Sequence, residues 1–327
     1  MAISLIISGT VLIFIFMGFG ILCLRYSLNK KQADQEWSAH VPEKLSNFGS
    51  IESLTILPLI DWYAVKETLI GECGVSWLIQ ADRNNILLDT GANMKKQDPS
   101  PLLRNMKTLN IDLKEVQHLF ISHPHMDHVG GLASQKARTV KLSTDDTDLS
   151  RMTLYTSTPM THPSAKVVLI DKPRVLMPGV ASEGPISRSL FGMGMTREQA
   201  LVVNVTGKGL VLIAGCGHQG VEKIFERAEA VFDEPIFGFV GGLHYPVTES
   251  RMKMMGLPVQ KLLGTGKLPW QKITRDEVKE SIAFLKSKNL GLISISAHDS
   301  CDWTLDRFRK EFKGIYKELK VGLPITI

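Results

Sequence analysis

A dense cluster of metal-binding side chains constrains this chain more than any other feature of its sequence. Four of them lie within the six-residue segment 123–128, namely His123, His125, Asp127 and His128. The segment follows a short apolar run at 118–121 that is typical of a buried strand, and a Gly-Gly pair comes after it. A loop at a strand end directs alternate side chains toward two neighbouring ions, which a helix does less readily. The cluster therefore predicts a two-metal site at the edge of a sheet.

The pattern around the cluster alternates between strands and helices in two halves. Short apolar or alternating runs predict strands at 54–59, 75–80, 86–88, 118–121, 167–170, 200–205, 210–214, 236–240 and 293–297. Helical spacing predicts helices at 101–109, 219–232, 274–288 and 305–319. Thr274 and Glu277 form a capping-box pattern at the start of the third helix. Such an order favours sheets sandwiched between helices.

The N-terminus carries a second strong signal. Residues 3–24 contain no charge, and 22 helical residues span roughly 33 Å, enough to cross a bilayer. A cleaved signal peptide would have a basic start, a shorter apolar run and a small-residue cleavage site, and this segment has none of them. We predict a single transmembrane anchor at 1–24. Because Arg25, Lys30 and Lys31 follow the run, the positive-inside bias predicts a single-pass membrane protein with a cytoplasmic body.

The remainder divides into a linker and a folded domain. Residues 25–50 are polar with little apolar periodicity, so we predict a tether there and a domain from 51 to 327. Four cysteines, one of them in the anchor, imply no disulfide framework. The formal charge of +5 is modest and mostly dispersed, which argues against a nucleic-acid partner.

The histidine cluster resembles the His-x-His-x-Asp-His signature of the metallo-β-lactamase superfamily, and Asp89-Thr90-Gly91 looks like the Asp-Thr-Gly turn of that superfamily. Motifs at 214–220, 241–244 and 296–299 resemble those of the branch that contains archaeal dihydropterin-ribofuranosylaminobenzene phosphate synthase. The resemblance covers about residue 51 to the C-terminus. It implies an α/β fold, the αββα sandwich of that superfamily, here preceded by the transmembrane helix. It also implies two divalent metals, usually Zn²⁺ with Mn²⁺ or Fe²⁺ as alternatives.

The resemblance also assigns ligands. His123 and His125 would bind the first metal, and Asp127, His128 and His298 would bind the second. Two ions of this kind generate a hydroxide at neutral pH and stabilise charge on the attacked oxygen, and Asp127 would orient that hydroxide while ligating its metal.

The third ligand of the first metal is less direct. Many superfamily members place a histidine before the hairpin strands, where this chain has 182–185 without one, so we predict His218 instead. Cys216 occupies the place of a bridging aspartate, and a thiolate binds zinc well. The alternative for Cys216 is a small buried core residue.

Two further residues have open roles. Asp89 either holds a ligand histidine or its loop, or only caps a turn. His244 follows a buried run and a Gly-Gly pair, so it either acts on substrate as a catalytic residue or is a strand-end histidine satisfied by backbone.

These observations predict a metal-dependent, di-zinc hydrolase of a small-molecule substrate with an ester, phosphodiester or lactone-like bond. A transferase similar to the pterin synthase, and a membrane-tethered binding module without turnover, are the alternatives. A flavo-diiron oxidoreductase is disfavoured because that branch has Glu where this chain has His125. Nucleic-acid processing is disfavoured because such members carry a large extra domain before the last histidine motif.

The segment 249–275 is a basic insertion or lid. It holds six basic residues and the single acid Glu249, a net charge of +5. Because it follows His244, it could lie near the metals and receive an anionic substrate. Its methionines and leucines allow two other interpretations, a face resting on anionic lipid and an ordinary solvated insertion.

Overall fold

The computed structural model describes residues 2–39, 41–145 and 147–327, and in the first helix it describes side chains from Leu12 onward. Met1, in the predicted anchor, and His40, in the predicted tether, lie outside the described residues, as does Asp146.

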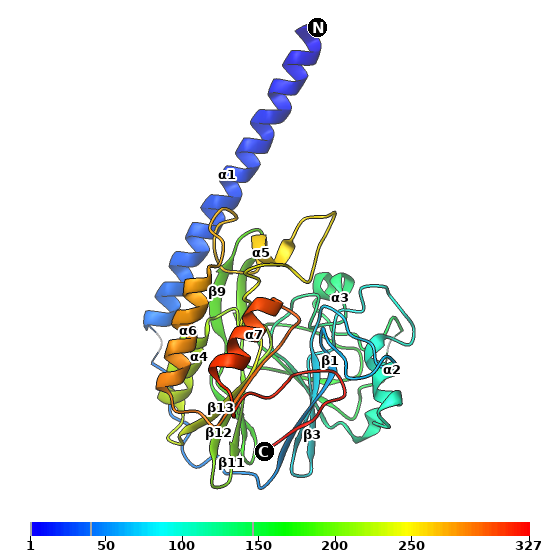
Figure 1. The fold of residues 1–327 in the computed structure, drawn as a ribbon. Coiled ribbons are helices and arrows are strands. Elements are labelled where there is room, and N and C mark those ends of the chain that lie inside the picture. Colours follow the sequence, from blue (N-terminus) through cyan, green and yellow to red (C-terminus); the bar gives the residue numbers. More distant parts are fainter. Residues whose placement is uncertain (1, 40, 146) are drawn as a thin grey trace.

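Two large sheets form the centre of the molecule (Figure 1). The first has seven strands in the order β15 (Ile325–Thr326), β1 (Leu54–Ile60), β2 (Ser76–Ala81), β3 (Asn84–Leu88), β4 (His118–Ile121), β5 (Thr153–Thr156) and β6 (Lys166–Leu169). The second has six in the order β14 (Leu292–Ile295), β13 (Ile236–Gly241), β12 (Gly209–Ala214), β11 (Leu201–Val205), β8 (Val180–Ser182) and β7 (Arg174–Met177). A separate hairpin joins β9 (Ile186–Leu190) and β10 (Gly194–Glu198).

Helices cover the outer faces of the sheets. The first sheet packs on α2 (Pro101–Thr108), and α3 (Leu132–Ala137) and a short 3₁₀ helix (Leu113–Glu115) lie in the loops on its side. The second sheet packs on α4 (Val221–Val231), α6 (Arg275–Ser287) and α7 (Asp302–Glu311). A third apolar cluster, which includes Trp77 and Val211, lies between the two sheets. The layers are therefore helix, sheet, sheet and helix, as predicted from the sequence.

Local signals explain most of these elements. The predicted capping box at Thr274 and Glu277 is present at the start of α6, with both reciprocal hydrogen bonds. A turn at 206–208 connects β11 to β12 as an antiparallel hairpin, and Gly207 within it adopts φ +70°. The last predicted helix is shorter than expected. It ends at Glu311. The backbone leaves helical geometry at Phe312, and Gly314 then adopts φ +101°.

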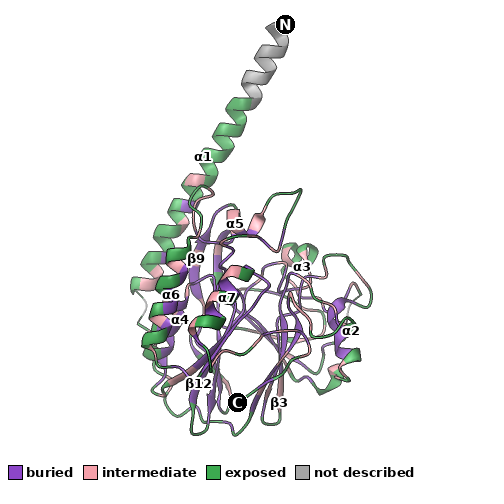
Figure 2. Cartoon of the chain, viewed as in Figure 1, coloured by how far each residue is buried: buried purple, intermediate pink, exposed green. Residues whose placement is uncertain are grey.

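The first helix, α1 (Ala2–Ala39), runs well past the predicted anchor. Its part from Leu12 onward is long and apolar enough to cross a membrane, and the side chains at 12–22 are mostly exposed (Figure 2). An exposed apolar stretch of this length on a helix needs lipid or a protein partner.

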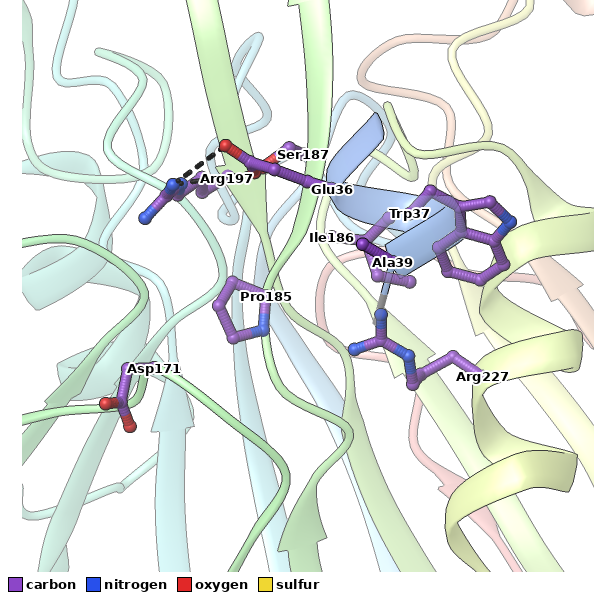
Figure 3. Close-up of a pocket in the computed structure, with 9 residues that line it drawn as sticks. All are labelled: Glu36, Trp37, Ala39, Asp171, Pro185, Ile186, Ser187, Arg197 and Arg227. Atoms are coloured by element: carbon purple, nitrogen blue, oxygen red, sulfur yellow. Dashed lines mark hydrogen bonds and ion pairs between the residues drawn. The ribbon is translucent and has the colours of Figure 1, made fainter. Parts of the chain in front are cut away.

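Residues 25–39, which the sequence predicted to be part of a polar tether, instead continue α1 and dock on the body. Tyr26 and Ala33 are buried, and the Ser189 hydroxyl donates to the carbonyl of Tyr26 at 3.0 Å. Figure 3 shows the end of α1 beside a cavity of about 290 Å³, where Glu36 accepts a hydrogen bond from Ser187 at 2.6 Å. Trp37 stacks under Arg227. The docking of residues 25–39 was not predicted, because the residues of this part of α1 that face the body are mostly polar.

Candidate metal centre

The predicted ligands come from strand ends that meet at one edge of the sandwich. Strands β3 and β4 run parallel in the first sheet, and β12, β13 and β14 run parallel in the second, so within each sheet their carboxyl ends lie at one edge. Each strand is followed there by a site residue: Asp89, the 122–128 loop, Cys216, His244 and His298.

Two groups of donor atoms share the Cys216 thiol. Asp127, His128, Cys216 and His298 form one group, and His123, Cys216 and His218 form the other; within each group the donor atoms lie within 4.8 Å of one another. The Cys216 Sγ atom is 3.0 Å from His128 Nε2 and 3.2 Å from His298 Nε2. The predicted ligand His125 belongs to neither group, but its Nδ1 lies 2.9 Å from His123 Nε2.

In His123, His128 and His298, the ring nitrogen Nδ1 contacts a carboxylate or a hydroxyl group. Asp89 accepts from His128 Nδ1 at 2.6 Å and from the Ser122 hydroxyl at 2.7 Å. The Ser122 oxygen in turn lies 3.0 Å from His123 Nδ1. With the proton on Nδ1 in both rings, each Nε2 is left free for a metal, as is usual for ligand histidines.

The same arrangement recurs at His298. Its Nδ1 lies 2.6 Å from the Ser296 hydroxyl, which donates to Asp61 at 2.6 Å. On the other side of the centre, His125 Nε2 lies 3.0 Å from the Thr196 hydroxyl. Each imidazole is thus fixed in orientation before a metal binds.

Glu198, which the sequence did not indicate, supports the turn that carries Cys216. Its carboxylate accepts hydrogen bonds from the backbone N–H groups of Cys216, Gly217 and His218 at 2.8–2.9 Å. Gly217 adopts φ +64°, and a Cβ there would lie 2.3 Å from the carbonyl oxygen of Gly242. Burial raises the pKa of Glu198 to about 7 despite these donors.

The segment 249–275, the predicted lid, lies directly against the centre. His218 Nδ1 is 3.0 Å from the carbonyl of Gly264, and His244 Nε2 is 3.1 Å from the carbonyl of Gln260. Both carbonyls accept, which leaves His218 Nε2 and His244 Nδ1 without a partner although both atoms are buried. The close approach requires Gly264, because a Cβ there would meet the His244 ring at 2.0 Å.

Burial and nearby carboxylates set the protonation of the centre. Burial lowers the pKa of His125 to about 3 and that of His244 to about 4, so both are neutral, as ligands must be. At His128 burial also opposes the charged form, but Asp89 and Asp127 outweigh it and raise the pKa to about 9.

The thiol of Cys216 is in the opposite situation. Burial, together with the carboxylates of Asp127 and Asp299, raises its pKa well above the usual value. A bound cation would reverse this effect, because a coordinating thiol loses its proton. Nitrogen, sulfur and carboxylate donors around two points, with His218 Nε2 unpartnered, fit two zinc-like ions.

His244 and Asp299 form a third group with Cys216. The His244 backbone N–H donates to Asp299 at 2.9 Å, and the His244 ring lies 4.7 Å from the His218 ring. The sequence motif at 296–299 contained Asp299, but gave it no role. The Ser296–Asp61 pair was missed as well, since Asp61 is far away in the chain.

The predicted basic lid is less positive than its composition indicates. Arg251 pairs with Asp302 at 2.6 Å, and Lys267 pairs with Glu277. A cavity of about 420 Å³ beside His218 and His244 contains carboxylates as well as lysines. The lining of this cavity is therefore of mixed charge and is not uniformly basic.

Comparisons with known proteins agree with this geometry. The family model of the metallo-β-lactamase superfamily matches residues 73–142. A dihydropterin-ribofuranosylaminobenzene phosphate synthase of Methanocaldococcus jannaschii is 24% identical over 265 residues, which cover 68% of this chain and 88% of the relative. A probable RNase of the same organism is 34% identical over 73 residues, or 22% of this chain and 16% of that protein.

The fold has a solved counterpart. The crystal structure of a metal-dependent hydrolase of the β-lactamase superfamily aligns with a TM-score of 0.57 at 22% identity, covering 83% of this chain and 98% of that one. The fold predicted from the sequence is therefore confirmed, and so is the resemblance of this chain to the metallo-β-lactamase superfamily. The individual ligand assignments, which the structure brings together, stay predictions.

Proposed function

We propose that this protein is a membrane-anchored, two-metal hydrolase of a small ester, phosphodiester or lactone-like substrate. The observation that carries the proposal is the position of Cys216, whose thiol belongs to both donor groups. His123, His125 and His218 would hold one ion, and Asp127, His128 and His298 the other, with Cys216 between them. Two such ions lower the pKa of a bound water and stabilise charge on the attacked oxygen.

The side chains around the metals then orient the reaction. Asp127 is nearly buried, and its carboxylate lies 3.8 Å from His128 Nε2, so an oxygen of Asp127 can accept the proton of the attacking water. Water adds to the carbonyl or phosphoryl centre, the bond to the leaving oxygen breaks, and that oxygen takes the proton from Asp127. His244 donates through Nε2 to the carbonyl of Gln260, so its buried Nδ1, which has no hydrogen-bond partner, is the acceptor that we assign to bind an N–H or O–H group of the substrate.

Metal content and turnover test the proposal. We expect the zinc-loaded protein to hold two ions by native mass spectrometry and to cleave chromogenic esters or phosphodiesters. Chelation and His125→Ala should each abolish turnover. A protein that binds no metal would contradict the proposal, and one that binds two metals without turnover would favour a binding module.

A transferase is the second candidate, because the curated relative is a synthase that this chain matches over 88% of its length. Cleavage in ¹⁸O-labelled water distinguishes the two reactions. A hydrolase places the label in the product, whereas a transferase consumes an acceptor and leaves the product unlabelled.

Replacing Asp127 by alanine should remove one metal more readily than the other. The carboxylate belongs only to the group with His128 and His298, so the ion held by His123 and His218 keeps its ligands. Native mass spectrometry at graded zinc counts the ions. An Asp127→Ala protein that keeps two metals at wild-type affinity would show the assignment to be wrong.

The membrane proposal has its own test. Arg25, Lys30 and Lys31 follow the apolar part of α1, so a reporter active only in the cytoplasm should work when fused after Ile327. Moving Lys30 and Lys31 to the front of Ile3 should reduce or invert that orientation. A reporter that works only outside the cytoplasm at the same fusion site would refute the orientation.

A further inference from the structure

The tip of the lid presents apolar side chains to the outside. Met255 is fully exposed, and Leu257 and Met254 are 59% and 45% exposed. The tip is a closed turn, because the N–H and carbonyl groups of Met254 and Leu257 bond reciprocally at 2.9–3.0 Å. The backbone of the turn therefore holds the side chains of Met255 and Leu257 out from the body, where they remain exposed.

A second part of the lid lies beside the apolar helix. Trp270 is 58% exposed and its ring lies 5.9 Å from the ring of Phe19 on α1. The Tyr26 hydroxyl donates to the carbonyl of Gly266 at 2.6 Å and fixes the lid to the helix. Figure 1 shows both loops of this segment, yellow and orange, at the end of the body from which α1 emerges.

The same end of the body is the end where the strands deliver the metal-binding side chains. A membrane that holds the exposed apolar part of α1 therefore lies over the lid and the centre. Tryptophan beside the helix at that level is typical of a membrane–water interface. The exposed methionines and leucine of the lid tip would enter that interface.

An apolar cavity lies beside the lid tip and beside the loop that carries the predicted ligands. It has a volume of about 720 Å³ and lies between α3 and the segment 92–96. Met254 of the lid tip lines it, together with Met94, Leu132 and Met126, the residue between two predicted ligands. Lys96, Lys136 and Lys141 also line it, and no Asp or Glu does among the residues that the structure describes.

We propose that the substrate is an amphiphile drawn from the membrane that holds α1. Its apolar chain would occupy the cavity between α3 and Met254, and its ester or phosphodiester head would reach the metal-binding side chains. The three lysines that line the cavity suit an amphiphile with a net negative charge. This inference rests on the proposed hydrolase and names the class of substrate.

The orientation is tested without any turnover. The full-length protein is reconstituted in vesicles of phosphatidylcholine and phosphatidylglycerol that contain brominated lipid, which quenches tryptophan in the membrane. We expect quenching in the wild type that Trp270→Phe largely removes, since Trp37 lies at the docked end of α1, against Arg227, and the other three tryptophans lie in the body. Equal quenching in both proteins would overturn the placement of the lid against the bilayer.

The substrate class is tested with a pair of substrates that share one head group. A long-chain ester or phosphodiester is placed in the vesicles, and its short-chain, water-soluble analogue is assayed with the same zinc-loaded protein. Combining Met254→Ser, Met255→Ser and Leu257→Ser should lower the ratio of long-chain to short-chain kcat/KM on the order of tenfold. Val175→Ser, at an exposed valine on β7, is the matched control and should not change the ratio.

The outcomes separate the two proposals. The proposal of an amphiphilic substrate would be overturned by either of two results. One is an unchanged ratio of long-chain to short-chain kcat/KM in the triple variant, and the other is a wild type that prefers the short-chain analogue. Absence of turnover with both substrates, in protein that holds two zinc ions, would contradict the hydrolase itself, while the quenching result still decides the orientation of the lid.

Discussion

Replacing Cys216 by alanine is expected to lower the binding of both metals and to abolish turnover. The thiol is the one side chain shared by the two main donor groups of the described residues, with Sγ close to both His128 and His298. Loss of a partner that only orients a ligand costs about 10–100-fold in affinity or activity, so loss of a shared ligand should cost at least about 100-fold. Native mass spectrometry under zinc titration, with kcat/KM, measures both effects.

The control for this change is a second buried cysteine. Cys301 is buried and lies outside the donor groups, so Cys301→Ala should keep two metals and near wild-type turnover. Asp127→Ala provides the contrast, because it should affect one ion more than the other. If Cys216→Ala bound two ions as tightly as the wild type, Cys216 would be only a small core residue, the alternative that the sequence left open.

The sequence predicted those parts of the centre whose information is local. His123, His125, Asp127 and His128 lie in one loop, and the apolar strand before it and the glycines after it indicate where the loop sits. The start of α6 was likewise predictable from local sequence, because Thr274 and Glu277 form its capping box. His218 and Cys216 came from a resemblance, and the structure brings both side chains into the predicted groups.

Contacts made through the backbone could not be predicted. The carbonyls of Gln260 and Gly264 hold His244 and His218, and a carbonyl carries no signature in the sequence. The sequence indicated that the lid follows His244, but not that it completes the setting of two histidines. The docking of α1 was missed for a related reason. Among the described side chains of α1 only Tyr26 and Ala33 are buried, and the other residues around them are mostly polar.

Glu198 is the clearest example of a site residue whose contacts with the backbone could not be predicted from the sequence. It ends β10 and its partners are backbone N–H groups 18 to 20 residues further along the chain. A lone glutamate at the end of a short strand usually faces solvent, so nothing in the sequence distinguished it. In the structure it is buried and organises the turn that presents Cys216 and His218.

Replacing Glu198 by alanine should therefore destabilise the fold and weaken metal binding together. The change leaves three backbone N–H groups buried without acceptors, and each such group costs about 1–3 kcal/mol. Removing a carboxylate whose charge is disfavoured by burial offsets part of this cost. We expect a net loss on the order of 3 kcal/mol in the free energy of unfolding, measured by denaturant titration of the full-length protein in detergent.

Two variants make the result specific to the hydrogen bonds. Glu198→Gln keeps one carbonyl oxygen as an acceptor and a similar volume, so its loss of stability and of zinc affinity should lie between those of the wild type and Glu198→Ala. Glu67→Ala, at an exposed position, should change the unfolding free energy by no more than about 0.5 kcal/mol. If Glu198→Ala left zinc affinity unchanged while it lowered stability, the carboxylate would serve the fold alone. The turn would then hold Cys216 and His218 in place through Gly217 and its contact with Gly242.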